Sequence, residues 1–134
     1  MTTVAVGFDY SEDSRAAADW AAAYARERDC ALVLVHAMGI LEQASFEDAR
    51  ASLAAAGADL AARSGLADAR VHAHVDYGDA CSVMLRCIEA PISASLLVVG
   101  TRGHHAHAGL LLGSTSLELA EHALVPVVIV PGQR

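Results

Sequence analysis

The segment from Gly100 to Ser116 holds residue types that could bind an anionic group. Gly100 ends an apolar run, and Gly103 and Gly113 follow it in the pattern G-x2-G-x9-G-S. Glycine lets a backbone N–H approach a ligand with no Cβ in the way, and a helix start presents free N–H groups and a partial positive charge. The pattern therefore favours a phosphate site built from backbone N–H groups and hydroxyls.

Spacing alone leaves a second interpretation open, because a flexible connector followed by a Gly-Ser helix start has the same residues. The segment is neither a Walker A motif nor a dinucleotide-binding fingerprint. All nine basic residues of the chain are arginines, and Arg102 is the one in this segment. The lack of lysine excludes Schiff-base chemistry and a P-loop lysine.

Length and composition predict one domain, residues 1–134, with one core, since 54% of the residues are hydrophobic. The net charge of -7 argues against nucleic acid or an anionic membrane surface as a partner. No signal peptide is recognisable, and no apolar run approaches the roughly 18 residues of a membrane span. We expect a cytoplasmic protein whose three cysteines are buried, reduced thiols.

Short apolar runs rich in valine and leucine alternate with alanine-rich segments along the whole chain. The runs predict strands at 4–8, 31–37, 69–75, 95–100 and 125–130, and the segments between them predict helices at 11–28, 45–63, 79–90 and 114–123. Continuously apolar strands that alternate with helices indicate a parallel sheet with helices on both faces. The long connection from Gly100 to Gly113 would then lie at the carboxyl edge, where such folds bind ligands.

Two stretches of the chain resemble the universal stress protein family. The run VVGTRGHHAHAGLLLGSTSLELAEHALVPVVIV is similar to the family's carboxyl-terminal signature, including its G-x2-G-x9-G-S motif, and VAVGFDYSEDSRAAADWA is similar to its first strand and capped helix. The resemblance implies a Rossmann-like, five-stranded parallel sheet in the order 3-2-1-4-5. It also implies that ATP, or ADP or AMP in its place, binds with Mg2+, as in the motif-bearing branch.

The family resemblance also implies a role for individual residues. Those expected at the adenosine are Gly7, Phe8 and Asp9, with Val35 offering main-chain groups to the adenine edge and Val99 and Gly100 beneath the ribose. Those expected around the phosphates are Arg102, Gly103, Gly113, Ser114, Thr115 and Ser116. Two plainer interpretations stay open: Asp9 as a helix-entry acid, and Val35 as an ordinary core residue.

The resemblance favours an adenine-nucleotide-binding module in stress response or signalling, with no catalytic residue assigned. Alternatives are a weak ATPase on the same site and a nucleotide-free dimerisation domain. In the strand order that the resemblance implies, the last strand is an edge strand. Family members form dimers through this strand, so the resemblance implies a homodimer. His104, His105 and His107 resemble a metal-binding tract by composition but have no acid or cysteine nearby, so no metal site is predicted and their role stays open.

Overall fold

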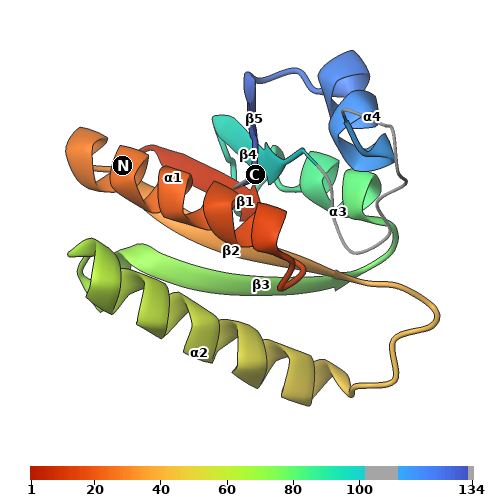
Figure 1. The fold of residues 1–134 in the computed structure, drawn as a ribbon, viewed down its shortest axis with the longest axis horizontal. Helices are drawn as coiled ribbons and strands as arrows, with labels where there is room; N and C mark the ends of the chain where they lie inside the picture. The colour runs from red at the N-terminus through yellow and green to blue at the C-terminus, as the bar shows by residue number, and fades with distance from the viewer. Residues whose placement is uncertain (102–111, 133–134) are drawn as a thin grey trace.

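The protein is described by a computed structural model that covers residues 1–101 and 112–132 (Figure 1). Strands and helices alternate as the sequence predicts. Their bounds are β1 Thr3–Gly7, α1 Glu12–Arg28, β2 Ala31–Met38, α2 Phe46–Ser64, β3 Val71–Tyr77, α3 Ala80–Arg86, β4 Leu96–Gly100, α4 Ser114–His122 and β5 Val127–Val130, with a 3-10 turn at Asp68–Arg70. In these two ranges no helix combines the length and apolarity that crossing a membrane requires.

The strands form one parallel five-stranded sheet in the order β3-β2-β1-β4-β5, which confirms the expected fold. From β1 the chain crosses to β2 on one side, and β4 lies on the other side. The connections therefore diverge at the carboxyl ends of β1 and β4, which is the place where open α/β sheets bind ligands.

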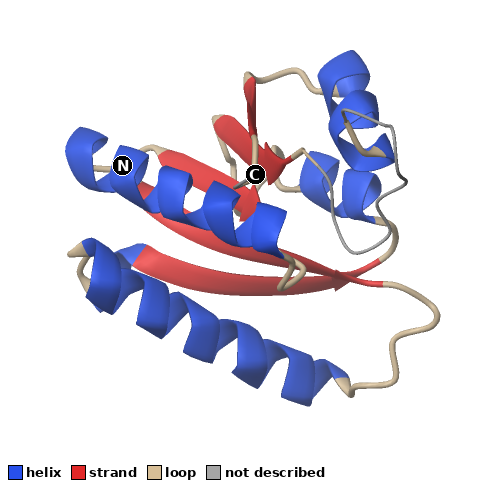
Figure 2. Cartoon of the chain, in the orientation of Figure 1, coloured by secondary structure: helices blue, strands red, loops and turns tan. Residues whose placement is uncertain are grey.

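Two helical layers cover the sheet. Figures 1 and 2 show α1 and α2 on one face, and α3 and α4 on the other. Each face has its own core: α1 and α2 pack on Val4, Val6 and Leu34, whereas α3 and α4 pack on Val33 and Leu97. The cysteines are buried as expected, and burial raises the pKa of the Cys87 thiol to about 11.

The buried face of helix α1 consists almost entirely of alanines, which let the helix pack close to the sheet. Its fully buried residues include Ala17, Ala21 and Ala25. Trp20 falls at the helical spacing of this face in the sequence, yet it is 38% exposed and stacks on Tyr24. An indole does not fit where only methyl groups separate helix and sheet.

Several element ends differ from the prediction. Helix α3 ends at Arg86 rather than at residue 90, because Cys87 N and Ile88 N bond carbonyls three residues back and tighten the last turn. The chain therefore leaves the helix before Pro91. Strand β5 begins at Val127, since Pro126 has no N–H to donate to the ladder.

Gly100, at the end of β4, packs directly against the backbone of α1. A Cβ at this position would lie 2.7 Å from the backbone carbon and oxygen of Asp13. Since backbone atoms cannot move aside as a flexible side chain does, this glycine is required for packing.

We predict that Gly100→Ala lowers the free energy of unfolding by about 1–3 kcal/mol, the usual effect of overpacking. The measurement is urea denaturation followed by circular dichroism. Gly39→Ala is the matched control, because a Cβ there meets nothing within 4 Å. Equal denaturation midpoints for the two variants would contradict the packing argument.

Candidate functional site

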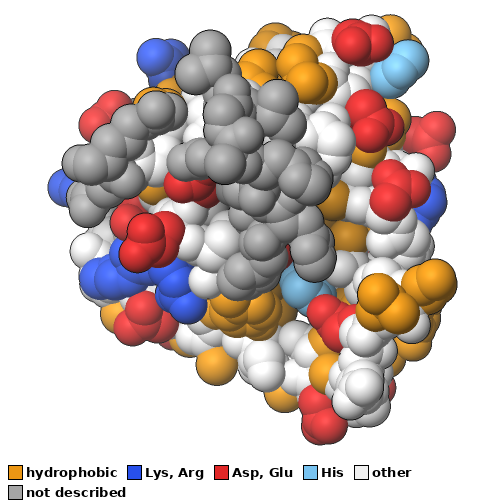
Figure 3. Space-filling model, turned by 45° about the vertical axis from the view of Figure 1, so that its right-hand side comes forward, with side chains coloured by type: hydrophobic (Ala, Val, Ile, Leu, Met, Phe, Trp, Pro, Cys, Tyr) orange, Lys and Arg blue, Asp and Glu red, His pale blue; other side chains and the backbone are white. Residues whose placement is uncertain are grey.

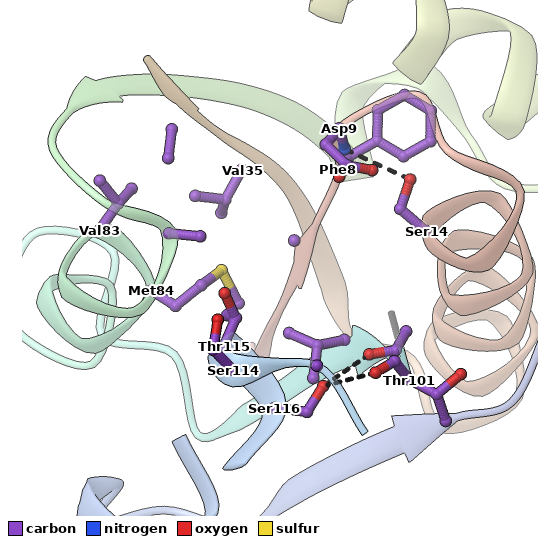
Figure 4. A pocket seen from close by; sticks show the side chains of 16 residues that line it. Phe8, Asp9, Ser14, Val35, Val83, Met84, Thr101, Ser114, Thr115 and Ser116 are labelled. Carbon is purple, nitrogen blue, oxygen red and sulfur yellow. Dashed lines mark hydrogen bonds between the residues drawn. The ribbon is translucent and has the colours of Figure 1, made fainter. Parts of the chain in front are cut away.

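A cavity of about 250 Å³ opens at the carboxyl edge of the sheet, between α3, α4 and the start of α1. It is lined by Gly7, Phe8, Asp9, Ser14, Val35, Ala37, Ala80, Val83, Met84, Val99, Gly100, Thr101, Gly113, Ser114, Thr115 and Ser116. Figure 4 shows apolar side chains on the α3 side and hydroxyls gathered at the start of α4. The cavity thus has an apolar end and a polar end.

Most of the predicted site residues come together in this cavity. Arg102 and Gly103 lie outside the described residues, as do His104, His105 and His107. All the other predicted positions line the cavity. The two separate stretches of sequence that suggested a site therefore meet in space.

The start of α4 differs from the starts of the other helices. Ser11, Ser45 and Asp79 each cap their helix by accepting a hydrogen bond from a backbone N–H. Gly113 at the start of α4 makes no side-chain cap bond. The first N–H groups of α4 are therefore not capped by a side chain where they face the cavity, and they carry the partial positive charge of a helix start.

The conformation of Gly113 does not itself require glycine, because its φ of -76° and ψ of 167° are open to any residue. What glycine contributes here is a missing side chain beside the first N–H groups of the helix. A cap residue with an oxygen would bond those groups and compete with a ligand.

Ser116 has a structural role that the sequence did not predict. Its side chain is 2% exposed, and its hydroxyl donates to the Gly100 carbonyl oxygen at 2.8 Å. A hydroxyl has one proton, so this bond leaves none for a phosphate. Ser114 is exposed and Thr115 half-buried at the cavity, so these two hydroxyls remain the better donors to a ligand.

Asp9 organises the chain between β1 and α1. One of its carboxylate oxygens accepts hydrogen bonds from the backbone N–H of Ser11, at 3.1 Å, and from the Ser11 hydroxyl. Its own N–H donates to the Ser14 hydroxyl oxygen at 3.3 Å, a contact drawn in Figure 4. Asp9 thus serves as a helix-entry acid and lines the cavity as well.

Tyr10 packs against Phe8, a residue that lines the cavity. Its backbone has φ 67°, in the left-handed region that favours glycine, and its ring contacts the edge of Phe8 with centroids 4.9 Å apart. Burial, followed by the Glu42 carboxylate, raises the pKa of the Tyr10 phenol above its usual value. The Tyr10 phenol is therefore neutral at physiological pH.

The end of β2 places Ala37, rather than Val35, with its backbone towards the cavity. The Val35 carbonyl oxygen already accepts a hydrogen bond from Phe8 N at 2.8 Å. Main-chain groups alternate in direction along a parallel ladder, so those of Ala37 also point to the β1 side. The β1 ladder ends at Gly7 opposite Val35, and no β1 residue stands opposite Ala37.

Sequence reasoning missed the α3 wall and the position of Ala37 at the cavity. Ala80, Val83 and Met84 line the apolar end of the cavity. The signal for the wall was present, because α3 starts directly after β3 at the same edge of the sheet. The signal for Ala37 required the register of β1 against β2, which the sequence does not give.

Charge at the cavity is sparse. None of the described arginines lines it; Arg63 pairs with Asp19 and Asp59, and Arg86 pairs with Asp76. Figure 3 shows acidic and basic side chains interspersed over this side of the molecule. Over the part of the chain that the structure describes, no group of three or more metal-binding side chains occurs. Among the described residues, the groups at the cavity suited to attract an anion are the first N–H groups of α4.

Comparison with known proteins gives one consistent result. The model of the universal stress protein family matches residues 1–131. A curated universal stress protein of Mycolicibacterium smegmatis is 33% identical over an alignment of 143 positions. The alignment covers 96% of this chain and 48% of that protein. The chain therefore spans about half the length of this relative.

Solved structures share the fold over nearly the whole chain. The universal stress protein UspA from Lactobacillus plantarum superposes with a TM-score of 0.80 at 16% identity, over 96% of this chain and 97% of that one. A universal stress protein crystallised in complex with cAMP superposes with a TM-score of 0.77 at 26% identity, over 98% of both chains.

We predict that Ser116→Ala lowers the free energy of unfolding by about 1 kcal/mol, because the half-buried Gly100 carbonyl loses a hydrogen-bond donor. Ser114→Ala is the control, since Ser114 is exposed at the start of the same helix. Urea denaturation of both variants provides the measurement. The assignment fails if Ser114→Ala is the more damaging change.

Proposed function

Because the chain belongs to the universal stress protein family, we propose that its cavity binds an adenine nucleotide, with ATP, ADP and AMP as the candidates. The observation that carries the proposal is the start of α4, which has no side-chain cap and opens into the cavity. Phosphate oxygens are suited to accept from these N–H groups. The related protein crystallised with cAMP supports a nucleotide as the ligand class.

The apolar end of the cavity suits a flat aromatic base. Val83 and Met84 lie on the α3 side, and Val35 lies opposite them at the sheet. A thioether packs well against aromatic rings. The main-chain groups of Ala37 would then read the hydrogen-bonding edge of the base, and the ribose would lie over Val99 and Gly100.

The absence of lysine from the chain shapes this mode of binding. Of the described residues, only Asp9 brings a full charge to the cavity lining, and its charge is negative. Mg2+ would arrive with the triphosphate, since this ion is commonly held through phosphate oxygens, waters and one or two carboxylates. We propose a nucleotide-sensing module in a stress response, without assigning a catalytic group.

We further propose that the chain forms a homodimer through β5, an edge strand of the sheet. Leu97 N donates to Pro126 O, and Thr101 N donates to Val130 O. The main-chain N–H and C=O groups of the even-numbered residues of β5 therefore point towards β4. Val127 and Ile129 therefore point their N–H and C=O groups outward. An open edge of this kind is a template for a second strand, and the prolines at 126 and 131 limit its length.

We predict that the wild-type protein binds AMP more tightly than adenosine in calorimetry, because only AMP brings a phosphate to the start of α4. Gly7→Val should lower the affinity for AMP by about tenfold or more, which is a change of at least about 1.4 kcal/mol in the free energy of binding. A Cβ at Gly7 lies 3.4 Å from Met84 Sδ and Val99 Cγ1, so a larger side chain fills the cavity.

Gly39→Val is the control for this experiment, because position 39 faces open space. Titrations with Mg-ATP and GMP in the same series identify the preferred phosphate chain and base. A wild-type protein that binds none of these nucleotides would rule out the proposed function.

For the dimer, we predict that Ile129→Pro shifts the protein to monomer in light scattering, because it removes an outward-facing donor from β5. Ala73→Pro is the matched control on β3, at the opposite edge of the sheet. Gly78 N donates to Met38 O, so alternation along the ladder points Ala73 N outward too. A wild-type monomer at tens of micromolar, or a dimeric, folded Ile129→Pro variant, would exclude this interface.

A further inference from the structure

Thr101 connects three elements at the polar end of the cavity. It directly follows β4 and is 7% exposed. Its N–H donates to Val130 O at 3.1 Å, and its carbonyl oxygen accepts from Gly113 N at 2.6 Å. Its hydroxyl donates to Asp13 Oδ2 at 2.8 Å, across 88 residues of sequence. All of its polar groups are therefore engaged, and they link β5, the start of α4 and α1.

Asp13 is tightly confined on the α1 side of this link. A Cβ on Gly132 would lie 1.8 Å from Asp13 Oδ1, and a Cβ on Gly100 would lie 2.7 Å from the Asp13 backbone. Two glycines thus make room for the residue, one before and one after the segment that holds α4. The direction of the carboxylate is consequently set by its surroundings.

Thr101 lines the cavity but is poorly suited to donate to a phosphate. Its hydroxyl has one proton, which the bond to Asp13 uses. Its remaining lone pairs would face an anion that also offers lone pairs. The carboxylate of Asp13 likewise repels a phosphate. Neither side chain therefore acts as a direct phosphate ligand.

We propose that Asp13 and Thr101 are a positioning pair that holds the start of α4 in place for the phosphate. The chain of contacts runs from α1 through the Asp13 carboxylate to the Thr101 hydroxyl, and from the Thr101 carbonyl to Gly113 N. A hydrogen bond to a charged acceptor is stronger than one between neutral groups, so the bond to Asp13 can hold Thr101 in a fixed position. The proposal rests on the proposed function, because the phosphate is the group that α4 would bind.

The test compares AMP with adenosine in calorimetry. Thr101→Val removes the donor at nearly constant volume and should weaken AMP by roughly tenfold, as expected for a lost charge-assisted hydrogen bond, while adenosine affinity stays within about twofold. Thr101→Ser keeps the hydroxyl, so its affinity for AMP should stay close to that of the wild-type protein. Equal weakening of AMP and adenosine by Thr101→Val would indicate general damage and overturn the proposal.

A double-mutant cycle tests whether the two residues act together. Once Asp13→Ala has removed the acceptor, adding Thr101→Val should change the affinity for AMP by less than about twofold, since contacting residues are not additive. Full additivity of the two effects would overturn the pairing.

Amide hydrogen exchange gives a readout that needs no ligand. Thr101→Val should speed exchange at the Gly113 amide, which bonds Thr101 O, while the Cys30 amide, bonded to Ala25 O, stays unchanged. A wild-type protein that binds no nucleotide would refute the proposed function, and the exchange rates would still show whether the pair holds α4. Unchanged exchange at Gly113 would refute the pair.

Discussion

Helix α1 and strand β4 approach each other so closely that Gly100 has no room for a Cβ beside the Asp13 backbone. This contact sets where α1 begins relative to the carboxyl edge of the sheet. The Asp9 turn, the Ser14 hydroxyl and the Asp13 carboxylate all take their positions from that point. Any change in the distance between helix and sheet would therefore alter one whole side of the cavity.

Alternating apolar strands and alanine-rich helices were enough to predict the fold class, and the family resemblance supplied the strand order. Individual contacts were harder to predict. Trp20 falls at the spacing of a buried face, yet the residues of α1 that are buried are five alanines and Ser14. Ser116 belongs to the motif that was expected to bind phosphate, but its hydroxyl donates its hydrogen bond to the Gly100 carbonyl oxygen. Such outcomes depend on distances between elements, which residue spacing along one chain does not contain.

The two motif glycines within the described residues have different physical reasons to be present. Gly100 permits the packing of α1, whereas Gly113 leaves the start of α4 without a side-chain cap. One therefore supports the fold, and the other keeps donors available at the cavity. The chain has no lysine, and none of its described arginines lines the cavity.

The hydrogen bonds of Ser14 also determine how the cavity can respond to an occupant. Ser14 is the residue of α1 that lines the cavity, and its hydroxyl accepts a hydrogen bond from Asp9 N and donates one to Ser11 O, so this wall is held in one arrangement. The opposite wall contains Met84, whose three rotatable bonds allow it to fit differently shaped surfaces. Accommodation of ligands of different shape should consequently occur on the α3 side, which gives the cavity one rigid wall and one compliant wall.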